Sequence, residues 1–171
     1  YSVEKLRTAE SLASLAALID PALYASENAL RDEAWRALGS YWEHDFGGGG
    51  IGAVIQRGNW QIDLQQAISS YVDQLYETSL NALASNIEVP PDKIRFVVFN
   101  GLGWTRNDYT DIAYNGSTNI KIIEIAGGTE VPFEIINHNG TQYLRILASG
   151  IPPVGYKVYE IQSGPAGSFP N

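Results

Sequence analysis

The chain has 171 residues, of which 44% are hydrophobic and 18% are charged, and its 19 acidic and 11 basic side chains give a formal net charge of -8 at pH 7. Binding to a nucleic-acid backbone requires clustered Lys and Arg, so no nucleic-acid partner is expected. No stretch approaches the roughly 20 apolar residues that cross a bilayer, so no membrane association is expected either. The composition is that of a soluble globular protein.

The sequence contains no Cys and no Met, and it begins at Tyr1. The absence of Cys excludes disulfides, thiolate metal sites and cysteine nucleophiles. The absence of an initiating Met, of a basic leader region and of an apolar leader region indicates a fragment of a longer polypeptide. We therefore expect that part of the chemistry lies upstream of Tyr1.

The period of the apolar pattern changes at Pro90-Pro91, and this change is the clearest domain boundary in the sequence. Apolar residues recur at helical spacing before it and alternate after it. We predict an α+β, multi-domain fragment, in which a three-helix bundle over residues 1–88 is followed by a partial antiparallel β-sandwich over residues 92–171.

The three predicted helices are delimited by local signals. Asp20-Pro21 ends the first helix, because the residue before proline is disfavoured in the α region. Ser26 offers an N-cap to the second helix, which should end near Asp45. The third should run from about Trp60 to Ser85. The expected buried stripes are Ala9, Leu12, Ala13, Ala16 and Ile19, then Leu30, Ala34, Leu38, Tyr41 and Trp42, then Leu64, Ile68, Tyr71, Leu75, Ala82 and Leu83.

Six short strands are predicted beyond the proline pair, because β-rich runs there alternate with turn pairs such as Asn115-Gly116, Gly127-Gly128 and Asn139-Gly140. A count this low indicates that the sandwich continues past Asn171. The predicted strands are Ile94 to Phe99, Tyr109 to Tyr114, Ile120 to Ile125, Val131 to Ile136, Tyr143 to Leu147 and Gly155 to Ile161.

The segment 42–52, WEHDFGGGGIG, concentrates the polar chemistry of the helical half. A histidine between carboxylates, followed by glycines that allow a close approach, is suited to contacting a metal or a sugar. A histidine near a helix C-terminus also interacts favourably with the helix dipole, and glycines commonly end helices. Both interpretations remain open on spacing alone. The glycine run lacks the Lys-Ser/Thr ending of a P-loop and follows no strand, which excludes a nucleotide site.

The other candidate functional residues are the second histidine and the tryptophans. His138 precedes Asn139-Gly140 and is expected to be a solvated residue of a hairpin loop. Trp42 falls on a core stripe, whereas Trp60 and Trp104 lie near element ends and are candidates for stacking on sugar rings.

Three collinear motifs resemble glycoside hydrolase family 38, the zinc-dependent retaining α-mannosidases. The first is His44-Asp45 followed by a loop of small residues. The second is the segment 98–106, VFNGLGWTR, which is similar to the family's Val-Phe-Asn-Pro-Leu-Ser-Trp-x-Arg signature. The third is Val131-Pro132 followed by the segment 150–157, GIPPVGYK. The resemblance covers nearly the whole chain and implies the middle domain and the first strands of the C-terminal sandwich.

The resemblance implies two site residues in this chain. His44 would be a zinc ligand, and Asp45 would hydrogen-bond the bound sugar of an α-mannoside. The remaining ligands, the nucleophile and the acid/base would come from an upstream catalytic domain of the same polypeptide. Glu43 and Gly47 to Gly50 depart from the family pattern, in which the residue before the ligand is a histidine or an aromatic residue and the loop carries Ser or Thr. The alternative function is a non-catalytic carbohydrate-binding module or a structural linker.

Overall fold

A computed structural model describes residues 2–24, 28–41 and 51–169, which divide into two compact units, Tyr1–Asn86 and Ile87–Asn171. The first unit is helical and the second consists of two antiparallel sheets, so the predicted α+β class is confirmed. The assignment of residues 1–88 and 92–171 to separate domains stays a prediction. Within the described ranges, we find no helix with the length and apolar character of a membrane span.

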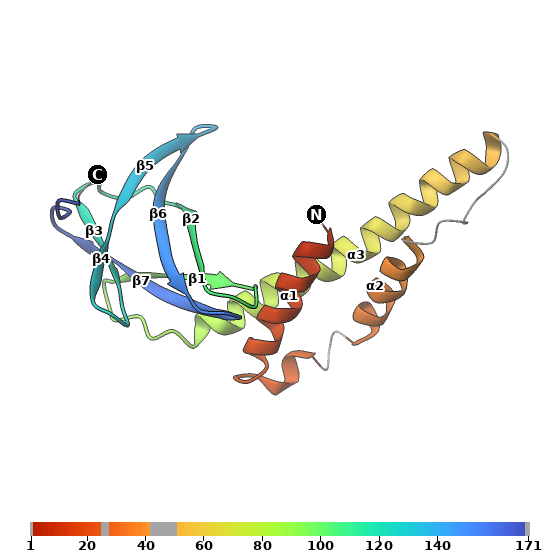
Figure 1. Cartoon of the computed structure of the whole chain (residues 1–171), viewed down its shortest axis with the longest axis horizontal. Helices are drawn as coiled ribbons and strands as arrows, with labels where there is room; N and C mark the ends of the chain where they lie inside the picture. Colours follow the sequence, from red (N-terminus) through yellow and green to blue (C-terminus); the bar gives the residue numbers. More distant parts are fainter. Residues whose placement is uncertain (1, 25–27, 42–50, 170–171) are drawn as a thin grey trace. The chain divides into compact units, whose positions relative to one another are not determined.

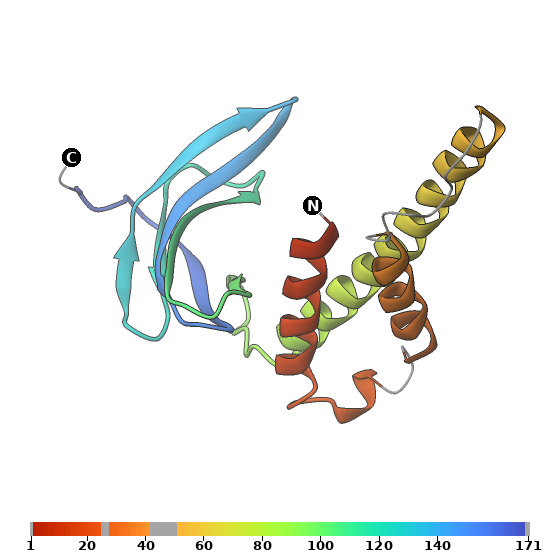
Figure 2. The same ribbon diagram turned by 45° about the vertical axis from the view of Figure 1, so that its right-hand side comes forward.

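The helical unit contains α1 (Ser2–Ala16), a 3-10 helix η1 (Pro21–Tyr24), α2 (Asn28–Tyr41) and α3 (Ile51–Ser85). Both α1 and α2 pack along α3 (Figures 1 and 2). Small residues of the two shorter helices meet larger side chains of α3, which lets the helices approach closely. The core of this unit comprises Leu6, Ala9, Ala13, Ala16, Leu23, Ala34, Ala37, Ile68, Tyr71, Val72 and Leu75.

Two of the predicted helix boundaries are wrong. The first helix ends at Ala16 rather than at Asp20, and Ile19, which we expected on the buried stripe, is 42% exposed. The third helix begins at Ile51, well before Trp60, and contains Gly58. A glycine costs a helix only about 1 kcal/mol, whereas extension of an existing helix adds one hydrogen bond per residue. The helix therefore continues through Gly58 instead of beginning after it. The expected N-cap Ser26 lies outside the described residues.

Glu10 connects the three helices. Its Oε1 atom accepts a hydrogen bond from the Tyr71 hydroxyl of α3 at 2.6 Å and one from Trp35 Nε1 of α2 at 3.3 Å. Tyr71 is fully buried, and a buried hydroxyl is expected to be hydrogen-bonded. An ion pair between Lys5 and Asp73 adds a second link between α1 and α3.

The β unit contains seven strands among the described residues, in two antiparallel sheets of order β1-β7-β3-β4 and β2-β6-β5. The inward faces of both sheets meet in one core of Ile120, Ile122, Leu144, Ile146, Ala148, Ile151, Tyr159 and Ile161. Figure 2 shows these sheets from a second direction. The strands are β1 (Ile94–Asn100), β2 (Arg106–Ala113), β3 (Ile120–Glu124), β4 (Thr129–Val131), β5 (Phe133–His138), β6 (Thr141–Ile151) and β7 (Gly155–Ser163).

The single strand predicted from Val131 to Ile136 is two strands, β4 and β5, which belong to different sheets. Pro132 lies between them and has no N–H to continue the ladder, so the chain crosses from one sheet to the other there. The hairpin turn predicted at Asn139-Gly140 is confirmed. Both residues have positive φ, 49° and 80°, as a two-residue hairpin turn of the primed type requires.

Asn100 holds together one end of the β unit. The side chain is 1% exposed, and its Nδ2 lies 2.8 Å from the carbonyl oxygen of Trp104, 3.0 Å from that of Pro152 and 3.3 Å from that of Ile151. Its Oδ1 accepts the N–H of Leu102 at 3.0 Å. One buried amide therefore joins the loop after β1 to the loop before β7.

Glu160 on β7 is only 4% exposed and lies opposite Arg95 of β1. Gln162 and Arg95 donate hydrogen bonds to its carboxylate at 2.8 and 2.9 Å, and Lys93 lies 3.8 Å away. Arg95 also donates to the carbonyl oxygen of Glu88. These donors, with Gln162 first, lower the pKa of the Glu160 carboxyl below its ordinary value despite its burial.

Asn100→Ala is expected to destabilise the β unit by about 2 to 4 kcal/mol, because it removes the two donors and the acceptor that bind main-chain groups of the two loops. Urea denaturation followed by circular dichroism measures this change. The matched control is Asn115→Ala in an exposed turn, which should change the free energy of unfolding by less than about 0.5 kcal/mol. Equal effects of the two substitutions would contradict the role assigned to Asn100.

Glu160→Gln is expected to lower the stability of the β unit at neutral pH and to flatten its dependence on acid. Because folding lowers the pKa of Glu160, its carboxylate stabilises the fold above the ordinary value of 4.5, and this contribution is lost as pH falls through the folded-state pKa. Urea midpoints recorded over the acidic range test this. Glu88→Gln is the control, because Glu88 contacts Arg95 through its main-chain carbonyl. An unchanged acid profile in Glu160→Gln would refute the linkage.

Candidate functional site

The site predicted from the sequence lies outside the described residues. The helix α2 ends at Tyr41 and α3 begins at Ile51, so His44, Asp45, the neighbouring Glu43 and the run Gly47 to Gly50 fall between them. The roles of His44 and Asp45 stay predictions. Within residues 2–24, 28–41 and 51–169, no three His, Asp or Glu side chains are grouped as a metal site requires.

The other two sequence motifs lie side by side. The strands β1 and β7 pair so that Val98, Phe99 and Asn100 face residues 157, 156 and 155. The N–H of Val154 also donates to the carbonyl oxygen of Leu102 at 2.9 Å. Together with the bonds of Asn100, these contacts make the two motifs one structural element at the end of the β unit. The sequence did not predict their adjacency.

The tryptophans proposed for sugar stacking differ in exposure. Trp104 is 63% exposed at the loop after β1, whereas Trp60 is half-buried on α3. Trp35 is half-exposed and donates to Glu10. Of the three, Trp104 presents the largest free aromatic surface.

His138 ends β5 beside the hairpin turn and is exposed, as expected. It lines a shallow hollow of about 580 Å³ together with Tyr143 and a bidentate ion pair, in which both bonds between Arg145 and Asp111 measure 2.7 Å. The hydrogen bonds of this pair lower the pKa of Asp111 and raise that of Arg145. The opposite charges of Asp111 and Arg145 therefore neutralise each other.

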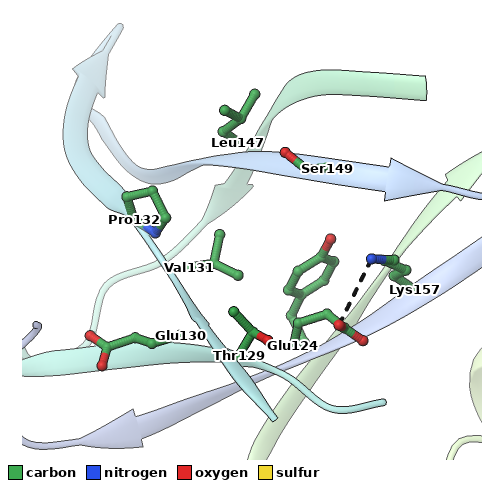
Figure 3. A pocket seen from close by; sticks show the side chains of 9 residues that line it. Glu124, Thr129, Glu130, Val131, Pro132, Leu147, Ser149 and Lys157 are labelled. Carbon is green, nitrogen blue, oxygen red and sulfur yellow. Dashed lines mark ion pairs between the residues drawn. The ribbon is translucent and has the colours of Figure 1, made fainter. Parts of the chain in front are cut away.

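Several charged and polar side chains of the β unit line a hollow between its two sheets, which we call the inter-sheet cavity (Figure 3). Its volume is about 270 Å³, and its walls come from β3, β4, β6 and β7. Its lining residues are Glu124, Thr129, Glu130, Val131, Pro132, Leu147, Ser149, Lys157 and Tyr159. A wider hollow of about 700 Å³ shares Glu124 and Lys157 with it.

Glu124 is fixed at the wall of this cavity. It is 8% exposed, and its carboxylate accepts the N–H groups of Ala126 at 2.9 Å and of Gly127 at 3.2 Å in the turn after β3. Lys157 Nζ lies 3.8 Å from the same carboxylate, and Figure 3 shows the two side chains pointing toward each other. The carboxylate is therefore held by the turn and faced by an ammonium group.

Tyr159 lies opposite Glu124 in the register of β7 and β3. The residue is 1% exposed, and its ring stacks on Phe96 with a centroid separation of 5.4 Å. Burial, and then the charge of Glu124, raise the pKa of Tyr159 to about 12, so its hydroxyl remains a proton donor at neutral pH. That hydroxyl has no hydrogen-bond partner in the part of the chain that the structure describes.

The arrangement places a fixed acceptor, an ammonium donor and a phenol donor on one face of the sheet. Such a set can bind and orient a polar molecule. The sequence analysis missed these residues. The alternation of Ile120, Ile122 and Glu124 places a carboxylate at an inward position of β3, and this polar residue in a buried row was the available signal.

Two solved structures share the fold of the chain. One is an alpha-mannosidase from Enterococcus faecalis V583, with a TM-score of 0.67, and the other is a protein in glycosyl hydrolase family 38 from Enterococcus faecalis, with a TM-score of 0.71. The matches cover 98% and 99% of this chain at 16% sequence identity. No protein-family model and no curated protein matches the chain.

These matches define the class of fold to which the chain belongs. The helical and β units together have the fold of a segment of glycosyl hydrolase family 38 proteins, so the resemblance stated from the three motifs is confirmed at the level of the fold. The chain spans only 23% and 24% of the lengths of the two solved chains. An identity of 16% shows the fold alone.

Gly127→Ala is expected to displace the Glu124 carboxylate, because an added Cβ would lie 2.9 Å from Glu124 Oε2. We expect a loss of stability of about 1 to 2 kcal/mol and an upfield shift of the Ala126 amide proton as its hydrogen bond weakens. Gly103→Ala is the control, since nothing lies within 4 Å of the added Cβ there. An unshifted Ala126 amide would show that Gly127 does not hold Glu124 in place.

Proposed function

We propose that the chain is a segment of a zinc-dependent retaining glycoside hydrolase, similar to the α-mannosidases and acting on α-mannosides. The observation that supports this most strongly is the match of both units, in one alignment over 98% and 99% of the chain, to the two family-related structures. The order of the three sequence motifs supports it independently. On this proposal the segment contributes one zinc ligand and one substrate contact, and the nucleophile lies elsewhere in a longer polypeptide.

The donor chemistry of this chain suits a partial zinc site. Zinc takes imidazole nitrogen and carboxylate oxygen, and a catalytic site needs three or four ligands. On this proposal His44 is joined by ligands from other parts of the polypeptide, and the absence of Cys from the chain leaves imidazole and carboxylate as the donors that it can supply. When bound, zinc would supply Lewis-acid polarisation of the sugar hydroxyls that it contacts.

The residues of this chain would bind and orient the substrate. His44 would hold the metal through a ring nitrogen. Asp45 would accept a hydrogen bond from a sugar hydroxyl and so fix the ring of the mannoside. Retaining hydrolysis needs two further carboxylates, roughly 5 Å apart, as nucleophile and acid/base. We assign neither role to Glu43.

A carbohydrate-binding module without catalysis is the second candidate function. The inter-sheet cavity favours it, because it offers unused donors beside a carboxylate without any of the residues assigned to zinc. Hydrolysis of a mannoside by the zinc-loaded polypeptide that carries this segment separates the two functions. Binding of the sugar without turnover would favour the module.

His44→Ala in the longer polypeptide is expected to reduce zinc content and to lower kcat/KM for a mannoside by at least about 100-fold, because a ligand of the metal is lost. Zinc is measured by atomic absorption and turnover with an aryl mannoside. The matched control is His138→Ala, since the exposed His138 lies beside a hairpin turn. Full metal content and turnover in His44→Ala would refute the assignment. The 171-residue chain alone should bind zinc weakly.

A further inference from the structure

The inter-sheet cavity contains hydrogen-bonding capacity that the fold does not use. The Tyr159 hydroxyl has no partner among the described residues, although the residue is 1% exposed. Lys157 Nζ is 3.8 Å from Glu124, which is beyond hydrogen-bond distance, and its side chain is 27% exposed. Both groups line the cavity, so water or a ligand there can accept hydrogen bonds from them.

These groups lie on one face of one sheet. In the register of β3 and β7, Glu124 is directly opposite Tyr159, and Lys157 is two residues before Tyr159 on the same side. The carboxylate of Glu124 can accept about four hydrogen bonds, of which the N–H groups of Ala126 and Gly127 supply two. The Glu124 carboxylate can therefore accept further hydrogen bonds, and it lies beside two groups that can donate them, Lys157 Nζ and the Tyr159 hydroxyl.

The charge and walls of the cavity define the chemistry of a ligand. Glu124 and Glu130 disfavour an anion, whereas Lys157 and Tyr159 offer hydrogen-bond donors that a metal ion cannot use. A hydroxyl group both donates and accepts, so two adjacent hydroxyls match a carboxylate beside an ammonium or phenol. Val131 and Pro132 add an apolar wall that can contact the C–H face of a ring. The volume of about 270 Å³ is at the small end for ligand cavities, which fits a single ring.

We propose that the inter-sheet cavity is a binding site for one neutral sugar ring, held by a pair of adjacent hydroxyls between Glu124, Lys157 and Tyr159. The site is in the β unit and uses neither His44 nor Asp45. It is therefore a binding site in addition to the one assigned under the proposed function, and it does not depend on zinc or on hydrolysis.

The test is a nuclear magnetic resonance titration of the ¹⁵N-labelled 171-residue chain with D-mannose. The amides of Ala126 and Gly127 should shift, because they donate to Glu124, together with those of Lys157 and Tyr159. Tetrahydropyran, a ring of the same size without hydroxyls, should leave them unchanged. An absence of shifts with D-mannose, or shifts confined to other regions, would overturn the proposal.

Tyr159→Phe removes the hydroxyl but keeps the ring that stacks on Phe96, so the fold should be retained. It should weaken binding about fivefold, as expected for one lost hydrogen bond. Lys157→Gln is a second variant with an expected loss of similar size. Tyr109→Phe is the matched control, since Tyr109 is 66% exposed and does not line the cavity. Equal affinities of the Tyr159 and Tyr109 variants would refute the site.

A His44→Ala chain should bind D-mannose in this assay as the unmodified chain does. This result separates the two proposals, because loss of zinc and turnover on mutation of His44 concerns the proposed function alone. A His44→Ala chain that no longer shifts the Ala126 and Gly127 amides would contradict a site in the inter-sheet cavity that is independent of His44.

Discussion

The hydrogen bonds of Asn100 are the interaction on which the β unit depends. A buried amide has two donors and an acceptor to satisfy, and here all of them bind main-chain groups of two loops. Because these loops flank β1 and β7, the amide fixes the ends of two paired strands. The register of β7 in turn positions both Glu124, through β3, and Arg95, through β1.

Buried polar groups also determine the helical unit. A core built from Ala9, Ala13, Ala34 and Ala37 against α3 buries little apolar area for each residue, which leaves the relative placement of the helices poorly specified by hydrophobic contact. Glu10 supplies the missing specificity, because its carboxylate must meet both the Tyr71 hydroxyl and the Trp35 indole. A shift of α3 along α1 would break the hydrogen bond of Tyr71, and a shift of α2 would break that of Trp35.

The spacing of apolar residues was sufficient to predict the elements whose pattern is amphipathic. It failed where helix extension, a missing N–H group or strand pairing determines the structure. The buried stripe of α3 at Ile68, Tyr71 and Leu75 was predictable from spacing. The start of α3 was not, because helix extension outweighs the cost of glycine. The missing N–H of Pro132 indicates a break in the predicted strand. It does not indicate that the chain passes from one sheet to the other at this residue. The predicted His44 and Asp45 lie outside the described residues, and the cavity residues converge only through β pairing.

Glu124 combines two requirements that usually conflict. A carboxylate that shapes a turn normally accepts most of its hydrogen bonds from that turn. Glu124 accepts hydrogen bonds from the N–H groups of Ala126 and Gly127 and can still accept others. Gly127 makes this possible, because a Cβ there would collide with the carboxylate. The hydrogen bonds that close the turn after β3 therefore also fix the conformation of the Glu124 side chain at the cavity wall. No side-chain rotamer of Glu124 needs to be ordered when a ligand binds. A preorganised group of this kind loses little entropy when a ligand arrives, which favours binding by few contacts.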